Sequence, residues 1–309
     1  MNIFFDEIVA MHTKRKSEGL FMEHQQDLFQ RRIRDKWTVQ YEEFGFPSIQ
    51  KGWVLPVDRW KDFDPFILMA EDWFKKGTFP DHPHRGFQTV TYVVDGRLEH
   101  IDNGGGRDIL EPGDVQYMNA GWAARHAEDG VENDIAHTLQ LWLNLPKDQR
   151  NSETIYQNVY GEEAPTVQID GGYLKVFSGN IAGEEGPMKS LVPITLTEIN
   201  LSEGAEYAHH LPENHNAFLY TLSGSADVAD GTVNKHDVAT LTFEEDGDPE
   251  ALSTLHIKAH KRRTRLLVYS GEPIREEIVP YGPFVMSSME EIKQAYRDFH
   301  QGKFGPPAE

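Results

Sequence analysis

Short segments in which apolar and polar side chains alternate are the feature that most limits how this chain can fold. They are separated by Gly, Pro, Asn or Asp and fill most of the 309 residues. The segment 136–146, for example, places Leu139, Leu141 and Leu143 on one side and stops at Pro146. Because successive side chains of a strand point to opposite faces, this pattern predicts many short strands. The expected fold class is therefore an all-β barrel or sandwich.

Turn residues predict how some of these segments connect. Asp95-Gly96 is a type I′ turn signal, so we expect residues 88–105 to form a hairpin. The glycines at 104–106 follow it without any sign of a helix, and we interpret them as a loop, not a phosphate cradle. Residues 146–172 are polar and weakly periodic, which indicates a linker between two β-rich halves.

Two segments are compatible with helices. In residues 287–302, Ser287 or Ser288 can act as N-cap, and Gly302 marks the end. Between them Ile292, Ala295 and Phe299 fall at helical spacing. Residues 14–36 are charged and rich in Gln and Arg, which is compatible with a short helix.

The composition excludes several classes of function. The chain has no cysteine, so it forms no disulfide or thiolate site, and any metal must be held by nitrogen and oxygen. A formal net charge of −20 repels a phosphate backbone, and we interpret the basic cluster at 260–265 as the solvated start of a strand. No apolar run approaches the roughly 20 residues of a membrane span. Asp6 and Glu7 precede the first basic cluster, an order unlike a secretory signal, so we expect a cytoplasmic protein.

Two pairs of residues with alternating spacing point to a metal site. His82 and His84 flank Pro83, and His126 and Glu128 form a second pair. Residues i and i+2 of a strand share a face about 6–7 Å apart. A single histidine is more often a surface or hydrogen-bonded residue than a ligand. Two such pairs on neighbouring strands, however, would bring three imidazoles and one carboxylate together.

Four segments of the chain resemble the signature blocks of the pirin family of bicupins. They are "DHPHRGFQTVTYVVDG", "LEPGDVQYMNAGWAARHAE", "HTLQLWLNLP" and the tail "LLVYSGEPIREEIVPYGPFVMSSMEEIKQAYRDF". The resemblance implies two cupin-type, jelly-roll-like β-barrels packed face to face, followed by a short C-terminal helix. It divides the chain into an N-terminal extension (1–36), a metal-binding cupin domain (37–150) and a pirin-type cupin domain without metal (151–309).

The same resemblance implies the ligands. Carried over one at a time, they are His82, His84, His126 and Glu128, around one metal that is normally iron. In the second half, His209, His210 and His215 form neither a His-x-His pair nor a His-x-Glu pair, so we interpret them as turn and surface residues.

Two residues depart from the family pattern. Trp122 and Arg125 lie where members of the family have a shorter segment that contains glycine. They would either reshape the mouth of the pocket or make ordinary packing contacts and a surface salt bridge.

The expected site has consequences for function. Three neutral imidazoles and one carboxylate suit Fe(II), and also Mn(II), Co(II), Ni(II) or Cu(II), and leave positions open for substrate and O₂. The resemblance implies a quercetin 2,3-dioxygenase-like enzyme acting on a small aromatic flavonol. In that reaction Glu128 could leave the metal and act as general base. One alternative is a redox-sensing regulator that binds transcription factors or other proteins. Another is a storage or structural bicupin whose metal only stabilises the barrel.

Overall fold

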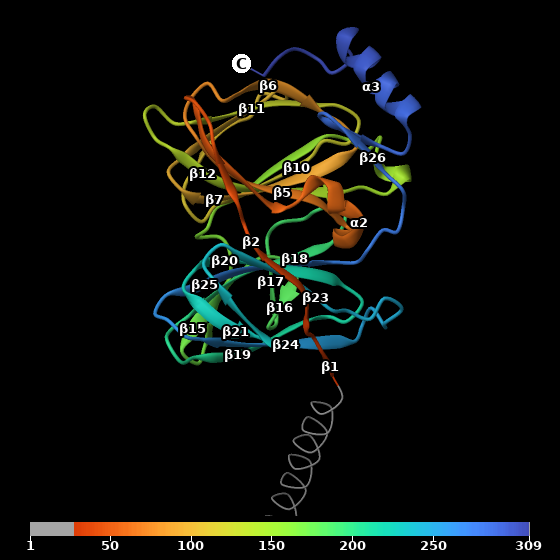
Figure 1. Cartoon of the computed structure of the whole chain (residues 1–309). Coiled ribbons are helices and arrows are strands. Elements are labelled where there is room, and N and C mark those ends of the chain that lie inside the picture. The colour runs from red at the N-terminus through yellow and green to blue at the C-terminus, as the bar shows by residue number, and fades with distance from the viewer. Residues whose placement is uncertain (1–27, 309) are drawn as a thin grey trace, which may run out of the picture.

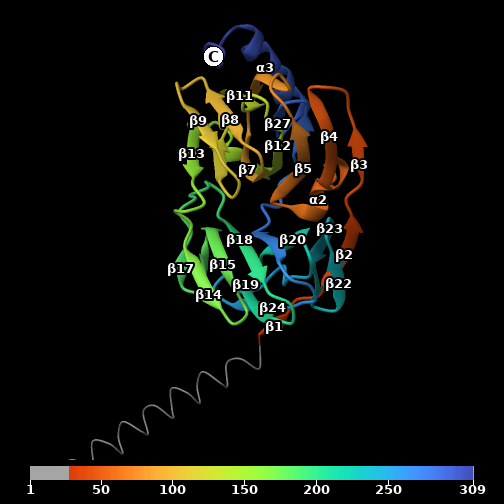
Figure 2. The ribbon, with the colours of Figure 1, turned by 90° about the vertical axis from the view of Figure 1, so that its left-hand side faces the viewer.

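The structure, a computed structural model, describes residues 28–308 and consists of two stacked β-barrels (Figures 1 and 2). The suggested helix at 14–36 is wrong where it can be judged, because β1 (Phe29–Gln30) and β2 (Ile33–Thr38) are strands. The remainder of that suggestion lies outside the described residues.

The N-terminal barrel is a sandwich of two sheets. Its seven-stranded sheet has the order β13 (Ile155–Val159), β10 (Val115–Asn119), β7 (Phe87–Asp95), β12 (Ala136–Asn144), β5 (Phe66–Phe74), β4 (Ser48–Leu55) and β3 (Tyr41–Glu43). Its four-stranded sheet has the order β6 (Phe79–His84), β11 (Ala124–Gly130), β8 (Leu98–Asp102) and β9 (Arg107–Leu110). Phe74, Val93, Leu98, Leu110 and Ala136 pack between the two sheets.

The C-terminal barrel repeats this plan. Its seven-stranded sheet has the order β14 (Thr166–Ile169), β15 (Gly172–Ser178), β18 (Ile194–Leu201), β25 (Thr264–Gly271), β20 (Asn216–Ser223), β23 (Asp237–Leu241) and β2. The opposing sheet has the order β1, β24 (Leu252–Ala259), β21 (Ser225–Val228) and β22 (Gly231–Asn234), with β19 (Glu206–Pro212) also paired to β24. The remaining elements are two small hairpins, β16 (Asn180–Ile181) with β17 (Glu184–Glu185) and β26 (Val279–Tyr281) with β27 (Phe284–Met286), and the helices η1 (Val57–Arg59), α2 (Trp60–Phe63), η2 (Lys147–Gln149) and α3 (Met289–His300).

The two seven-stranded sheets pack against each other through one apolar core. Tyr92 and Leu141 from the first barrel lie in the same buried cluster as Leu196, Phe218 and Leu267 from the second. The expected arrangement of two barrels packed face to face, with a short C-terminal helix, is confirmed (Figure 1).

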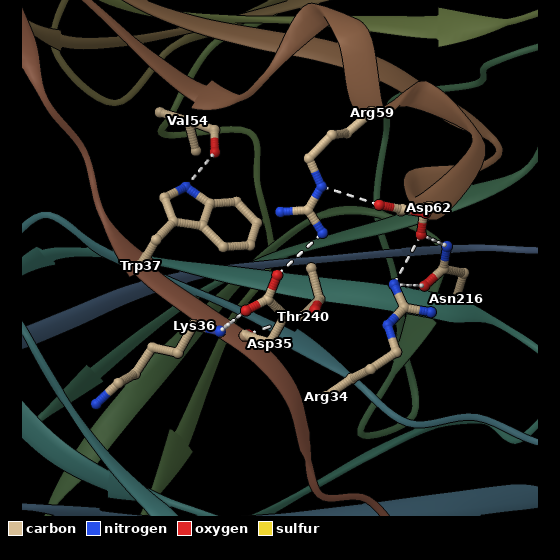
Figure 3. Close-up of polar contacts among 9 residues, drawn as sticks. All are labelled: Arg34, Asp35, Lys36, Trp37, Val54, Arg59, Asp62, Asn216 and Thr240. Atoms are coloured by element: carbon tan, nitrogen blue, oxygen red, sulfur yellow. Dashed lines mark hydrogen bonds and ion pairs between the residues drawn. The ribbon is translucent and has the colours of Figure 1, made fainter.

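Strand β2 ties the barrels together. It pairs with β23 of the second barrel, yet Arg59 of the first barrel bonds its Asp35 (Nη2 to Oδ2, 2.9 Å). Arg34 donates to the carbonyl of Asp62 at 2.7 Å, and the Trp37 indole donates to that of Val54 at 3.1 Å (Figure 3).

The expected linker at 146–172 is wrong, because these residues contain η2, β13 and β14. β13 pairs with β10 and so extends the first barrel past residue 150, just as β2 carries residues before 37 into the second. β13 is an edge strand with little buried surface, which explains the weak apolar period of this segment.

The expected hairpin at 88–105 is also wrong. β7 pairs with β10 and β12, whereas β8 pairs with β9 and β11. The turn at Asp95-Gly96 carries the chain from one sheet to the other. Gly96 has φ +69°, and a Cβ there would lie 2.0 Å from the carbonyl oxygen of Ile135, so only glycine fits. The glycines at 104–106 form a loop, as predicted.

Helix α3 matches its prediction. The Ser288 side chain accepts a hydrogen bond from the Glu291 amide, and Ile292 and Ala295 are buried. The chain reaches this helix by returning from the second barrel to the far end of the first (Figure 1). This return brings residues 279–286 beside β6, where the first histidine pair lies.

Candidate metal centre

Three histidines converge between strands β6 and β11. These strands are antiparallel neighbours in which His126 lies opposite His82 and Ala124 opposite His84. One ring nitrogen from each of His82, His84 and His126 lies within 4.8 Å of the others. Because i and i+2 share a strand face, the His82–His84 pair presents both rings to this point. The structure thus brings together the three predicted histidines.

The local chain geometry fits these positions. Pro83 has no backbone N–H to donate, and strand β6 ends at His84, two residues before Gly86. Gly86 has φ +86°, and a Cβ there would lie 2.0 Å from the carbonyl oxygen of Val285. Glycine is therefore required where the returning C-terminal segment crosses the histidine strand.

Each histidine has one ring nitrogen held by a neighbour. The Nδ1 atoms of His82 and His84 lie 2.9 and 3.2 Å from the carbonyl oxygens of Pro80 and Pro283. The Nδ1 of His126 lies 3.1 Å from the Nε2 of His100. Metal-binding histidines commonly have their second nitrogen held in this way.

The other nitrogens are left without partners. The Nε2 atoms of His84 and His126 are buried and make no hydrogen bond with residues 28–308. Burial lowers the pKa of both imidazoles well below the ordinary value, with a further contribution from the charge of His82. Both rings are therefore neutral at neutral pH, which is the form that coordinates metals.

Glu128 lies on strand β11, two residues after His126. Its Oε2 accepts a hydrogen bond from Gln140 Nε2 at 2.7 Å, and its buried Oε1 has no partner among residues 28–308. Burial raises the pKa of this carboxyl to about 7. A shift in strand register separates it from His126, and its oxygens lie outside the 4.8 Å group of histidine nitrogens.

These side chains fit a metal ion. Leaving a buried polar atom unpaired costs about 1–3 kcal/mol, and three such atoms belong to His84, His126 and Glu128. A cation bound by imidazole nitrogens and a carboxylate oxygen would satisfy all of them. This donor set suits Fe, Mn, Co, Ni and Cu ions.

His82, His84 and Glu128 line a cavity of about 640 Å³. Its wall is mainly apolar and includes Trp53, Leu68, Phe74 and Trp142, and the C-terminal segment 280–283 closes one side. A cavity of this size and composition is typical of small-molecule sites.

The sequence reasoning missed three contributors to this site: Gln140, His100 and Pro283. A polar Gln140 between the leucines of a core strand was a usable signal. Nothing in the sequence indicated that Pro283 would reach a histidine two hundred residues away.

The second-barrel histidines differ from the prediction. His209 is fully buried, so the expectation that it lies on the surface is wrong. His210 and His215 are half-buried, with Nδ1 atoms 3.2 Å from Thr254 Oγ1 and 3.0 Å from Ser270 Oγ.

Trp122 and Arg125 do not line the cavity. The Trp122 ring lies 3.8 Å from the Arg85 guanidinium, and Arg125 Nε donates to Asp81 Oδ1 at 3.2 Å. Of the two alternatives, the structure favours packing and a salt bridge. In the described part of the chain, no helix has the length and apolar character needed to cross a membrane.

Comparison with known proteins agrees with this architecture. The Pirin family profile matches residues 31–143, and the profile of the pirin C-terminal cupin domain matches residues 196–305. Human pirin is 37% identical over 253 residues, covering 79% of this chain and 84% of that protein. A putative quercetin 2,3-dioxygenase of Pseudomonas aeruginosa is 36% identical over 256 residues, covering 78% and 86%.

Solved structures give the same result. A quercetin 2,3-dioxygenase from Acinetobacter baumannii superimposes with a TM-score of 0.79 at 27% identity, covering 89% of this chain and 99% of that one. The protein GK1651 from Geobacillus kaustophilus gives 0.77 at 38% identity, covering 81% and 99%. The chain belongs to the pirin family of the cupin superfamily.

Proposed function

We propose that this chain is a metal-dependent dioxygenase that opens a ring of a flavonol-type substrate, as a quercetin 2,3-dioxygenase does. The observation that carries the proposal is the cluster of unpaired, buried ligand atoms at the end of a largely apolar cavity. His82, His84, His126 and Glu128 are the proposed ligands of one divalent ion. Fe(II) is the ion expected from the family, and Mn, Co, Ni or Cu also fits the donors. The names of the bacterial relatives support the same reaction.

When bound, the metal would supply a Lewis acid at which substrate oxygens and O₂ can meet. The residues of the chain bind and orient the substrate around that point. Trp142 stacks on Phe87 with ring centroids 4.1 Å apart and presents its indole to the cavity. Such apolar walls exclude water and favour a planar aromatic ligand.

Glu128 is the proposed general base. Gln140 holds its Oε2, while Oε1 has no partner among residues 28–308. In this role Oε1 would leave the ion and take the proton of the substrate hydroxyl, which requires the two oxygens to come within hydrogen-bond distance. Gln140 keeps the carboxylate in place during the transfer.

Oxygen consumption tests the proposal. Protein loaded in turn with Fe, Mn, Co, Ni and Cu is mixed with a flavonol in an oxygen electrode. We expect uptake with at least one metal, and a loss of about 10²-fold or more in kcat for Glu128→Gln. Metal content measured on the same samples separates a lost base from a lost ion. No uptake with any of these metals would contradict the proposal.

A further inference from the structure

An ion pair that the proposed chemistry does not use lies in the wall of the metal cavity. Lys51 Nζ is 3.6 Å from Asp72 Oδ1, and both residues line the cavity. Asp72 is only 7% exposed. No residue between 28 and 308 donates it a hydrogen bond within 3.5 Å, so most of its acceptor capacity is unused. The Asp72 carboxylate faces the cavity with few protein partners, so its acceptor sites are available to a ligand there.

Lys51 is held in place from two sides. Its ammonium lies 4.4 Å from the centre of the Trp53 ring and faces Asp72 on the neighbouring strand. Lys51 pairs with Asp72, and Trp53 pairs with Ala70, so all four side chains occupy one face of the sheet. This face also lines the cavity.

Strand register gives the separation between the ion pair and the metal end. Across β12, Ala70 lies opposite Gln140 and Asp72 lies opposite Thr138. Gln140 marks the level of the proposed metal ligand, because it donates to Glu128 at 2.7 Å. Two residues along a strand span about 6.8 Å, so Asp72 lies about that far from the level of Gln140.

Between Asp72 and the position of Gln140, the cavity wall carries a small side chain with aromatic rings on either side. Ala70 contributes only a methyl group there, while Trp53 and Trp142 border the same cavity. A flat aromatic ring fits over Ala70 without displacing a larger side chain. The spacing of about 6.8 Å along the strand leaves room for one ring between the metal-binding oxygens of a ligand and its distal polar groups.

We propose that Asp72 and Lys51 form a recognition site for hydroxyl groups on the end of the substrate that lies away from the metal. Asp72 accepts a hydrogen bond from one hydroxyl, and the Lys51 ammonium donates to the oxygen of its neighbour. The ligand class is therefore a planar aromatic with a pair of adjacent hydroxyls on its distal ring. This inference rests on the proposed function, since it takes the metal to bind the other end.

Binding in the absence of O₂ tests this site separately from turnover. The probes are 3-hydroxyflavone, which has no distal hydroxyl, and its 3′,4′-dihydroxy derivative. Affinities for metal-loaded protein are measured by calorimetry under nitrogen. We expect the wild type to prefer the dihydroxy compound by about 10-fold or more. In Asp72→Ala this preference should fall to within about 3-fold.

Two further variants keep the test decisive. Lys51→Met should reduce the preference while leaving Asp72 in place, and it provides the answer if Asp72→Ala does not fold. Asp58→Asn, which removes an exposed carboxylate at the rim of the same cavity, should retain the preference. An unchanged preference in the Asp72 and Lys51 variants, no preference in the wild type, or no binding of either probe would overturn the inference. Binding with the expected preference but no oxygen uptake would contradict only the proposed reaction.

Discussion

The role of a histidine in this chain depends on which partners its two ring nitrogens have. In the first barrel, a neighbour holds one nitrogen of each clustered histidine, and the other is available for an ion. In the second barrel, His209 is fully buried, and neither nitrogen has a hydrogen-bond partner among residues 28–308. Burial, with smaller contributions from the charges of His210 and Arg31, lowers the pKa of His209 to about 3.

Replacing His209 by leucine should therefore stabilise the protein. An apolar side chain removes two unsatisfied polar atoms, and we expect the free energy of unfolding to rise by about 1–3 kcal/mol at pH 7. The pKa of His209 is about 3 in the folded protein, below its ordinary value of 6.5. As pH falls below 6.5 the unfolded chain takes up a proton that the folded chain does not, and the wild type loses stability.

The gain from His209→Leu should thus increase by about 2 kcal/mol between pH 7 and pH 5. Urea denaturation at both values measures it. His210→Leu, on the opposite face of the strand, serves as control because it removes a hydrogen-bonded ring. A gain in His209→Leu that is the same at both pH values would contradict this account.

The sequence contained part of this information. The alternation of "DHPH" and "RHAE" was sufficient to predict the three clustered histidines. The segment "EYAHHLP" has two adjacent histidines, so one of them must face inward if the segment is a strand. Tyr207, His209 and Leu211 share that inward face, a signal that the turn-and-surface interpretation ignored. Gly86 also carried a signal, but its partner at Val285 could not be found without the fold.

At the level of elements, a buried carboxylate joins strands from both barrels. Glu71 on β5 accepts hydrogen bonds from His137 Nε2 at 2.7 Å and from the hydroxyl of Tyr220 on β20 at 2.6 Å. Tyr41 on β3 donates to the same carboxylate. Burial alone would raise the pKa of Glu71, but these three donors outweigh it and lower the pKa.

Glu71→Gln should weaken the contact between the barrels. The amide loses the charge that these donors recognise, and we expect a loss of about 2–3 kcal/mol in the free energy of unfolding at pH 7. Because the folded pKa is lowered, the stabilisation by Glu71 is present above its ordinary value of 4.5 and is lost as pH falls through the folded value.

Denaturation curves of wild type and Glu71→Gln at pH 7 and pH 3.5 measure this difference. We expect the gap between the two proteins to shrink at the lower pH. A gap of the same size at both values would mean that the carboxylate charge does not contribute.

The existence of strands could be predicted from the sequence, but their partners could not. Asp95-Gly96 has the local chemistry of a hairpin turn, yet the strands on either side enter different sheets. Pairing is decided by distant segments, such as the β12 residues opposite β7. Helix α3 was predictable because its cap and apolar spacing are local signals.

At the scale of the whole molecule, the two barrels share their largest core. Phe66, Tyr92 and Leu141 belong to the same buried cluster as Phe218 and Tyr269. Separating the barrels would expose this cluster to water, which costs about 25 cal/mol of free energy for each Å² of apolar surface exposed. A domain boundary near residue 150 remains a prediction. β2 lies before this residue but pairs with the second barrel, and β13 lies after it but pairs with the first.

We therefore expect the protein to unfold as a single unit. All six tryptophans lie between residues 37 and 142, so their fluorescence reports mainly on the first barrel. Far-UV circular dichroism reports on both barrels. The two signals should change at the same urea concentration, and metal binding should shift both midpoints upward together. Separate transitions for the two signals would show that the barrels are independent.

The fold class and the family were predictable from the sequence blocks around the two histidine pairs and the C-terminal tail. The pairing of β2 with the second barrel and of β13 with the first was not, because edge strands have weak apolar periodicity and their partners are far along the chain. The return of residues 279–286 to the metal cavity belongs to the same category.

The metal content of the purified protein tests the central claim most directly. Elemental analysis is carried out on the wild type, on His84→Ala, and on His210→Ala as a matched control from the second barrel. The account predicts one transition-metal ion per chain in the wild type and in His210→Ala, and none in His84→Ala. Equal metal content in His84→Ala and the wild type would contradict it.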